Sequence, residues 1–137
     1  MQQLFTEFIP KGATRKGNII ITFRDEAVFH RMSKCLQRNG FAVYWCRSFQ
    51  EFMAIEHLQF KCMVVDVTLG MASTFHAVET IKQSEVGKII PILAVGDATS
   101  SDHVVRALNA GAADYILHPY TDAEFIHRLN ALLDRPL

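Results

Sequence analysis

Short apolar runs alternate with amphipathic segments along most of this chain. Mainly apolar runs at residues 19–23, 42–46 and 62–65 are too short for buried helices and are typical of strands covered on both faces. Two further runs of this kind lie at residues 90–95 and 114–117. The pattern therefore predicts five buried strands.

The segments between these runs have apolar side chains at helical spacing. After the first strand, Val28, Met32 and Leu36 recur at every fourth residue, and Gly40 is expected to end this helix. A second helix is expected to begin at Ser48, which is a favourable N-cap residue. Its inward side chains are expected to be Phe49, Phe52, Met53 and Leu58. Three more helices are expected at residues 75–85, 101–110 and 122–133.

Strand and helix signals alternate throughout one domain, since 137 residues suffice for a single core without disulfides or metals. Parallel strands joined through helices form right-handed crossovers, which place helices on both faces of the sheet. The predicted fold class is α/β, a doubly wound three-layer sandwich with a five-stranded parallel sheet and five helices.

The first 18 residues lie outside this pattern. Pro10, Gly12 and Gly17 interrupt them, while the apolar residues before Pro10 lie at helical spacing. We therefore divide the chain into an N-terminal extension of residues 1–18 and a domain of residues 19–135. The extension is expected to be a short helix docked on the domain, a partner-binding element or a disordered tail.

Charge and composition narrow the function classes. The 14 basic and 14 acidic side chains balance, so net charge favours neither nucleic acid nor an anionic membrane as a direct partner. The apolar runs fall far short of the roughly 20 residues that span a bilayer, and the amino terminus lacks an export signal. Three scattered cysteines, Cys35, Cys46 and Cys62, are predicted to be reduced core thiols of a cytoplasmic protein. The spacing of cysteines and histidines predicts no metal site.

A single carboxylate ends the third predicted strand. Asp66 follows the apolar run of residues 62–65, and open α/β sheets place their chemistry at the carboxyl ends of strands. At the end of the last predicted strand stands the sequence His118-Pro119-Tyr120. Asp66 and His118 are therefore expected to face the same crevice.

These residues resemble the markers of CheY-like receiver domains of two-component response regulators. Asp66 matches the phosphoacceptor, Gly96 stands 30 residues later at the position of the switch Ser or Thr, and His118 stands 22 residues further at the position of the lysine. Residues 110–120 resemble the family's "AGADDYLxKPF" segment. Residues 124–133 resemble the "ELxARIxALL" helix of OmpR/PhoB-like transcription regulators. The resemblance implies a flavodoxin-like strand order, 2-1-3-4-5.

Most residues that handle a phosphoryl group in typical receivers are replaced in this chain. The family's two consecutive acids after the first strand fall on Phe23 and Arg24, and Asp25 is the only acid beside them. In typical receivers that acid pair helps to hold an octahedral Mg²⁺, which neutralises the phosphoryl group. Gly96 lacks the family's hydroxyl, and His118 lacks its permanent ammonium. No cofactor is therefore expected, and Mg²⁺ in particular is not.

Several of these residues have two interpretations. Asp66 is either an inherited strand-end carboxylate, held by hydrogen bonds or an ion pair, or a working phosphoacceptor. Arg24 is expected to pair with Asp66 and so to fill the vacant metal position with a fixed positive charge. His118 can be a simple strand-end cap. Tyr115 is either the aromatic residue that rotates inward in active receivers or plain core packing.

Four charged residues match positions on the dimer face of OmpR/PhoB-like receivers. They belong to the fourth and fifth predicted helices and the fifth predicted strand. They are Arg106, Asp114, Glu124 and Arg128. The resemblance implies a two-fold homodimer through this face, whereas the alternative is a set of solvated surface charges.

Three function hypotheses follow. The first is a non-enzymatic pseudo-receiver that controls a DNA-binding output domain beyond Leu137, with a histidine kinase or another signalling protein as partner. The second is a receiver in a phosphorelay that accepts phosphate on Asp66, with Asp25 replacing the lost acids. The third is a stand-alone adaptor that binds proteins.

Overall fold

The computed structural model describes residues 6–8, 16–22, 25–55, 59–68, 72–97 and 101–135. Its strands are β1 (Thr6–Phe8), β2 (Gly17–Thr22), β3 (Phe41–Trp45), β4 (Cys62–Asp66), β5 (Ile92–Asp97) and β6 (Asp114–His118). Its helices are α1 (Glu26–Arg38), α2 (Phe49–Ile55), α3 (Ala72–Gln83), α4 (Ser101–Ala110) and α5 (Asp122–Leu133), with a short 3₁₀ helix at Gly87–Ile89. Among the residues described, no helix is both long and apolar enough to cross a membrane.

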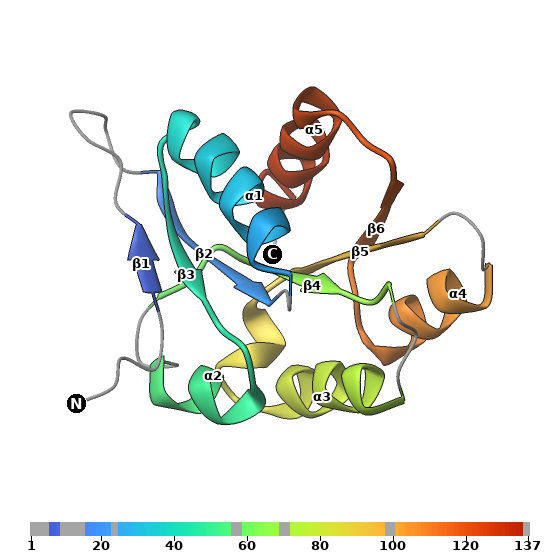
Figure 1. Cartoon of the computed structure of the whole chain (residues 1–137). Helices are drawn as coiled ribbons and strands as arrows, with labels where there is room; N and C mark the ends of the chain where they lie inside the picture. The colour runs from blue at the N-terminus through green and yellow to red at the C-terminus, as the bar shows by residue number, and fades with distance from the viewer. Residues whose placement is uncertain are drawn as a thin grey trace.

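Five parallel strands form the body of the sheet, in the order β3-β2-β4-β5-β6 (Figure 1). Counted from β2, this is the predicted order 2-1-3-4-5, and the predicted fold class is confirmed. The side chains of Ile19, Ile20 and Ile21 in β2 are all fully buried. Burial on both faces of the sheet is the reason that this strand has no polar alternation in the sequence.

A sixth strand, β1, extends the sheet beyond the predicted five. Thr6–Phe8 pair antiparallel with β3, with Glu7 opposite Tyr44. The expected helix in the N-terminal extension is therefore wrong for Thr6–Phe8, whereas residues 1–5 and 9–15 lie outside the described residues. So short a strand has no usable period in the sequence, and it forms because the edge of β3 offers unpaired backbone groups.

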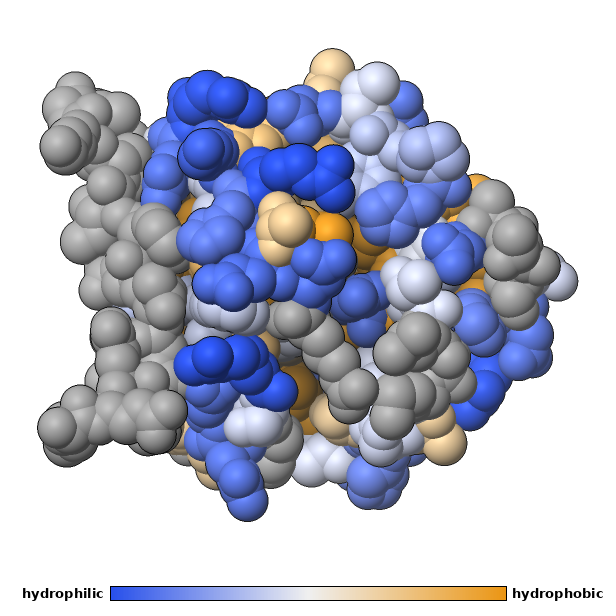
Figure 2. Space-filling model, in the orientation of Figure 1, coloured by the Kyte–Doolittle hydropathy of each residue, from blue (hydrophilic) through white to orange (hydrophobic). Residues whose placement is uncertain are grey.

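Helices cover both faces of the sheet. Figure 1 shows α1 and α5 on one face and α2, α3 and α4 on the other. On the first face, Phe29 of α1 stacks on Trp45 with ring centroids 4.5 Å apart, and Phe125 of α5 joins the same buried cluster. On the second face, Phe52 and Phe75 belong to a separate cluster. Hydrophilic residues cover most of the described surface in the view of Figure 2, with small hydrophobic areas visible between them.

The prediction of which side chains of the second helix face the core is only partly confirmed. Phe52 is buried, but Met53 is 44% exposed, so its inward placement is wrong. Ile55 is buried instead, because residues three apart share a helical face while adjacent residues do not. Leu58 and the side chain of Phe49 lie outside what the structure describes.

The three cysteines are free and buried, as predicted from their apolar surroundings. Burial raises the pKa of Cys46 and of Cys62 to about 12. Both therefore remain protonated thiols that pack as small apolar side chains.

Candidate functional site

The carboxyl ends of β4, β5 and β6 bring the predicted site residues to one edge of the sheet. Asp66 ends β4 beside Val95 of β5, and Asp97 ends β5 beside His118 of β6. Gly96 immediately precedes Asp97. Because these strands are parallel, Asp66, Gly96 and His118 lie at the edge where open α/β sheets form their ligand crevice.

The Asp66 carboxylate is half-buried and is held by a residue two positions later. The backbone N–H of Thr68 donates to Asp66 Oδ1 at 2.9 Å, and the Thr68 hydroxyl donates to the same oxygen at 2.5 Å. An ionised carboxylate held through one oxygen can still accept bonds on its other oxygen. Sequence reasoning missed Thr68, although an Asp with a hydroxyl residue two positions later is a known signal for this local turn.

Asp25, the acid beside the lost acidic pair, is the N-cap of α1. Its Oδ1 accepts hydrogen bonds from the backbone N–H groups of Ala27, at 2.9 Å, and Val28, at 3.3 Å. A carboxylate at this position satisfies unpaired donors and interacts favourably with the helix dipole. The local role of Asp25 is therefore to start a helix.

Phe23 and Arg24 lie outside the described residues, so the ion pair between Arg24 and Asp66 stays a prediction. Within the described ranges, no three histidine, cysteine, aspartate or glutamate side chains gather closely enough to hold a metal ion. The expectation about Mg²⁺ depends on positions 23 and 24 as well, and it also stays a prediction.

The Tyr115 side chain fills the space beside Gly96. Tyr115 is only 7% exposed. A Cβ atom at position 96 would overlap Tyr115 Oη, and it would lie 3.0 Å from Tyr115 Cζ and 3.2 Å from Val67 Cγ2. Burial, followed by the charges of Asp97 and Asp66, raises the pKa of Tyr115. Tyr115 is thus an uncharged phenol that points inward at neutral pH.

His118 lies against an aromatic ring at the end of β6. Its ring centroid is 4.8 Å from that of Tyr120, and the His118–Pro119 peptide bond is cis. Tyr120 continues toward Phe125, with centroids 6.0 Å apart, and burial raises the pKa of Tyr120 to about 12. Aromatic packing therefore positions His118, and no described residue forms an ion pair with it.

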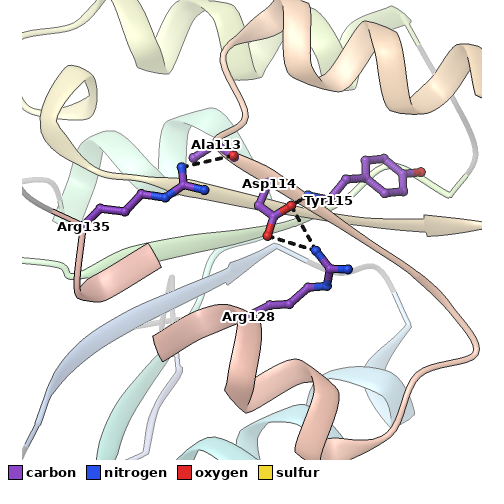
Figure 3. Close-up of polar contacts among 5 residues, drawn as sticks. All are labelled: Ala113, Asp114, Tyr115, Arg128 and Arg135. Atoms are coloured by element: carbon purple, nitrogen blue, oxygen red, sulfur yellow. Dashed lines mark hydrogen bonds and ion pairs between the residues drawn. The ribbon is translucent and has the colours of Figure 1, made fainter. Parts of the chain in front are cut away.

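The predicted dimer face contains an ion pair within the chain. Arg128 Nη1 donates to Asp114 Oδ1 at 3.3 Å and to Asp114 Oδ2 at 3.2 Å, which ties α5 to the start of β6 (Figure 3). Arg135 Nη1 also donates to the carbonyl oxygen of Ala113 at 3.4 Å. Figure 3 shows Tyr115 pointing away from the ion pair. Asp114 and Arg128 are thus already paired in a single copy.

Glu124 and Arg106, the other charged residues predicted on this face, have separate contacts. The Thr121 hydroxyl accepts from the Glu124 N–H at 3.1 Å and donates to Glu124 Oε1 at 3.3 Å. The Arg106 guanidinium lies over the Phe75 ring of α3, 4.4 Å from its centroid, and is 3.9 Å from Asp102. Arg106 therefore faces α3, whereas Glu124 lies in the first turn of α5.

Arg106 lines a shallow groove between α3 and α4. The other residues of the groove are Ala72, Phe75, His76, Glu79 and Asn109. Of the four charged residues predicted on the dimer face, the structure brings together only Asp114 and Arg128.

The sequence did not lead us to expect an exposed apolar surface on α4 and β6. Val105 and Leu108 of α4 and Leu117 of β6 are 53%, 45% and 44% exposed. Leu117 lies two residues after Tyr115, on the same face of the sheet. The sequence does contain a signal for this surface. Apolar residues of α4 extend around the helix beyond the face that is buried against the sheet.

A parallel sheet of five strands, with Asp66 at the carboxyl end of β4 and helices on both faces, is the architecture of receiver-type domains. The chain belongs to the response regulator receiver domain family, whose model matches residues 19–130. The family resemblance seen at Asp66 and in residues 110–120 is confirmed. Domains of this family are signalling modules that interact with histidine kinases and can dimerise.

The transcriptional regulatory protein SrrA of Staphylococcus aureus is 28% identical over 122 residues, which are 87% of this chain and 49% of SrrA. The chain thus spans about half the length of the curated relatives it matches. A response regulator from Thermotoga maritima has a TM-score of 0.76 at 20% identity, over 89% of this chain and 99% of its own. The receiver domain of a sensor histidine kinase from Pseudomonas aeruginosa, solved with a magnesium ion in its active-site cleft, has a TM-score of 0.76 at 20% identity over 87% and 98%. These two structural similarities support the fold alone.

Proposed function

We propose that this domain is an atypical receiver that regulates an output domain without Mg²⁺-dependent phosphorylation of Asp66. The packing of Tyr115 against Gly96 carries the proposal. The position from which a hydroxyl would reach a phosphoryl group has no side chain, and Tyr115 occupies its space. His118 replaces the lysine, and a histidine lacks a permanent positive charge at neutral pH. The domain then signals through binding rather than as an enzyme.

The proposal includes the absence of a bound metal cofactor. Phe23 and Arg24 stand at the matched acid positions, and Asp25 binds backbone N–H groups of α1. Mg²⁺ requires near-ideal octahedral oxygen coordination and gives up its water reluctantly. The carboxylate of Asp66 is a weak site without the missing acids.

We also propose that the output is a DNA-binding domain following this one in a longer protein. The match to SrrA, a transcriptional regulatory protein, supports this organisation because it covers only 49% of SrrA. DNA would then be bound by the output domain, since this domain has no net basic charge. The three free, buried thiols fit the reducing cytoplasm, where a histidine kinase or another signalling protein would be the partner.

Self-association through α4, β6 and α5 is the proposed means of output control. Val105, Leu108 and Leu117 offer exposed apolar surface on two adjacent elements. The pair formed by Asp114 and Arg128 adds fixed, partly exposed charge beside it. A two-fold interface uses this patch twice, and a stable one buries about 1,200–2,000 Å² in total.

Titration with Mg²⁺ and beryllofluoride, followed by Trp45 fluorescence and NMR chemical shifts, tests the proposal. The wild-type domain is expected to show no saturable change around Asp66 at about millimolar Mg²⁺, because one carboxylate holds a hydrated dication poorly. A variant carrying Phe23→Asp and Arg24→Asp restores the acid pair and is the matched positive control. It is expected to gain Mg²⁺ binding. Saturable changes around Asp66 in the wild type would contradict the proposal.

One observation favours a second candidate function, a receiver that accepts phosphate on Asp66 by atypical metal chemistry. The described hydrogen bonds to Asp66 reach only Oδ1, which leaves Oδ2 able to act as a nucleophile. The described hydrogen bonds to Asp25 likewise use only Oδ1, so its Oδ2 would be the atom that acts as a metal ligand. The same titration separates the two candidates, since the second requires a response in the wild type that Asp25→Asn abolishes.

A further inference from the structure

The strand β1 covers one edge of the sheet and lies outside the family domain. Thr6–Phe8 pair antiparallel with β3, whereas the match to the receiver family begins at residue 19. In Figure 1, β1 lies at one end of the sheet, and β3 lies between it and β2. If β1 were absent, the sheet would end at β3, and the outer backbone groups of β3 would be open to another chain.

The sequence of β3 contains none of the usual features that protect an edge strand. Edge strands avoid pairing with other chains by means of charged residues, prolines or β-bulges. Residues 41–46 are Phe-Ala-Val-Tyr-Trp-Cys, with neither a charge nor a proline. β3 also pairs with β2 residue for residue from Phe41 to Trp45, so no bulge interrupts it. A segment of this composition is typical of strands that pair with copies of themselves.

The backbone N–H groups of β3 point alternately to its two neighbouring strands. The N–H of Cys46 donates to the carbonyl oxygen of Ile21 in β2, at 2.9 Å. Because successive N–H groups of a strand point to opposite sides, those of Val43 and Trp45 point toward β1. The residues opposite them in β1 are Phe8 and Thr6. β1 therefore occupies the side of β3 from which a second chain would pair.

The edge that β1 presents in place of β3 is short and carries a charge. β1 has three residues, and the central one is Glu7. If two copies paired antiparallel through β1, with this residue at the centre, the two glutamates would be opposite each other. Like charges in that arrangement are destabilising. An antiparallel pair of β3 strands would instead be centred on Val43 and would contain no charge.

We propose that the edge of β3 is a strand-acceptor site for the β3 strand of a second copy, and that β1 blocks this site within the same chain. Two copies would pair antiparallel across a two-fold axis, which joins their sheets at one interface. An antiparallel partner already fits this edge, since β1 runs antiparallel to β3. β6 lies at the opposite end of the sheet, so this site is separate from the surface of α4, β6 and α5. The proposal does not depend on the function proposed for Asp66.

Hydrogen exchange, measured by NMR on the dilute intact chain, tests whether β1 covers this edge. A variant with Thr6→Pro and Phe8→Pro loses the two N–H groups of β1 that face β3, and proline cannot replace them. We expect the amides of Val43 and Trp45 to exchange about tenfold faster or more in this variant, because they lose their partners. Unchanged exchange at both amides would overturn the proposal.

Glu7→Pro is the matched control for the double proline variant. The N–H of Glu7 points away from β3, because it lies between two residues whose N–H groups face that strand, and proline is tolerated at such a position of an edge strand. Exchange at Val43 and Trp45 should therefore stay at the wild-type rate. The amides of Tyr44 and Cys46, which point to β2, are internal references in both variants. Equal acceleration in Glu7→Pro would show that the assigned pairing is wrong.

Sedimentation at increasing concentration tests whether the uncovered edge accepts a second copy. We expect the double proline variant to self-associate several-fold more strongly than Glu7→Pro, and the amides of Val43 and Trp45 to regain protection in the associated form. This added association should persist when Arg128→Glu is also present, since that residue belongs to the other end of the sheet. Association no stronger than that of Glu7→Pro, or its loss with Arg128→Glu, would overturn the proposal.

A single substitution tests the outer edge of β1 while β3 stays covered. Glu7→Val removes the charge from this edge, and Glu7→Lys replaces it with another charge. We expect Glu7→Val to associate several-fold more strongly than the wild type. Glu7→Lys should associate as the wild type does, because two lysines opposite each other also repel. Equal association of the two variants would show that charge at position 7 does not protect the edge, and this part of the proposal would be wrong.

Discussion

Arg128 of α5 binds both carboxylate oxygens of Asp114 at the start of β6, at 3.2 and 3.3 Å (Figure 3). The two side chains come from elements that the family resemblance places on one dimer face. The ion pair links α5 to the start of β6. Because both side chains remain partly exposed, they also present charge to a second copy.

Reversing the charge of Arg128 should therefore weaken self-association. Arg128→Glu places a carboxylate beside Asp114 and like charges across a two-fold axis, and we expect a loss of about 1–3 kcal/mol in dimer stability with strong salt dependence. Sedimentation equilibrium measures the change. Arg38→Glu is the matched control, because Arg38 forms an exposed pair with Asp122 at 3.1 Å between α1 and α5. A dimer indifferent to Arg128→Glu, or a monomer at hundreds of micromolar, would remove this face from the proposal.

Removing Arg24 should destabilise the domain more than neutralising Asp66. If Arg24 pairs with Asp66, Arg24→Ala leaves a half-buried carboxylate without its counter-charge, at a cost of about 1–3 kcal/mol, whereas Asp66→Asn is neutral and still accepts the Thr68 bonds. Urea unfolding of both variants gives the comparison. In the double variant the Arg24→Ala effect should largely vanish. An Arg24→Ala effect of the same size in the Asp66→Asn background would show that the two residues are not paired.

Asp25 should contribute to stability as a helix cap. Asp25→Ala is expected to lower the free energy of unfolding by about 1 kcal/mol, while Asp25→Asn retains the accepting oxygen and most of the stability. Glu26→Ala, an exposed change at the next position, is the control. Thermal or urea unfolding suffices for the measurement. If Asp25→Asn proved as destabilising as Asp25→Ala, charge rather than capping would explain the residue.

The stability of the domain should fall at alkaline pH. Burial raises the pKa of Tyr120 from 10.0 to about 12 in the folded state, so the unfolded chain loses its proton first as pH rises. The contribution of Tyr120 is fully present below pH 10 and is lost as pH rises through about 12, with a slope of at most about 1.4 kcal/mol per pH unit. Urea midpoints between neutral and alkaline pH should fall less steeply in Tyr120→Phe. Parallel slopes in the two proteins would rule out this residue as a source.

The sequence alone allowed the body of the fold to be predicted, because the information is local. The apolar triplet of Ile19, Ile20 and Ile21 identifies a strand buried on both faces, and the helical spacing of Val28, Met32 and Leu36 identifies the helix that follows. Alternation of such elements leaves few topologies, since crossovers are right-handed. β1 could not be predicted in this way, because it forms by pairing with the edge strand β3. No local sequence pattern shows which strand will lie at the edge of the sheet.

The sequence also placed Asp66 and His118 at strand ends, since the end of a buried strand is visible as the end of an apolar run. Distances between residues on different elements depend on packing, and tertiary structure decided them. The overlap between Tyr115 and a Cβ at position 96, the pair of Asp114 with Arg128, and the stacking of Arg106 on Phe75 are contacts of this kind. Residue type and spacing give the direction in which a side chain leaves its strand or helix, while the neighbouring elements determine what it meets there.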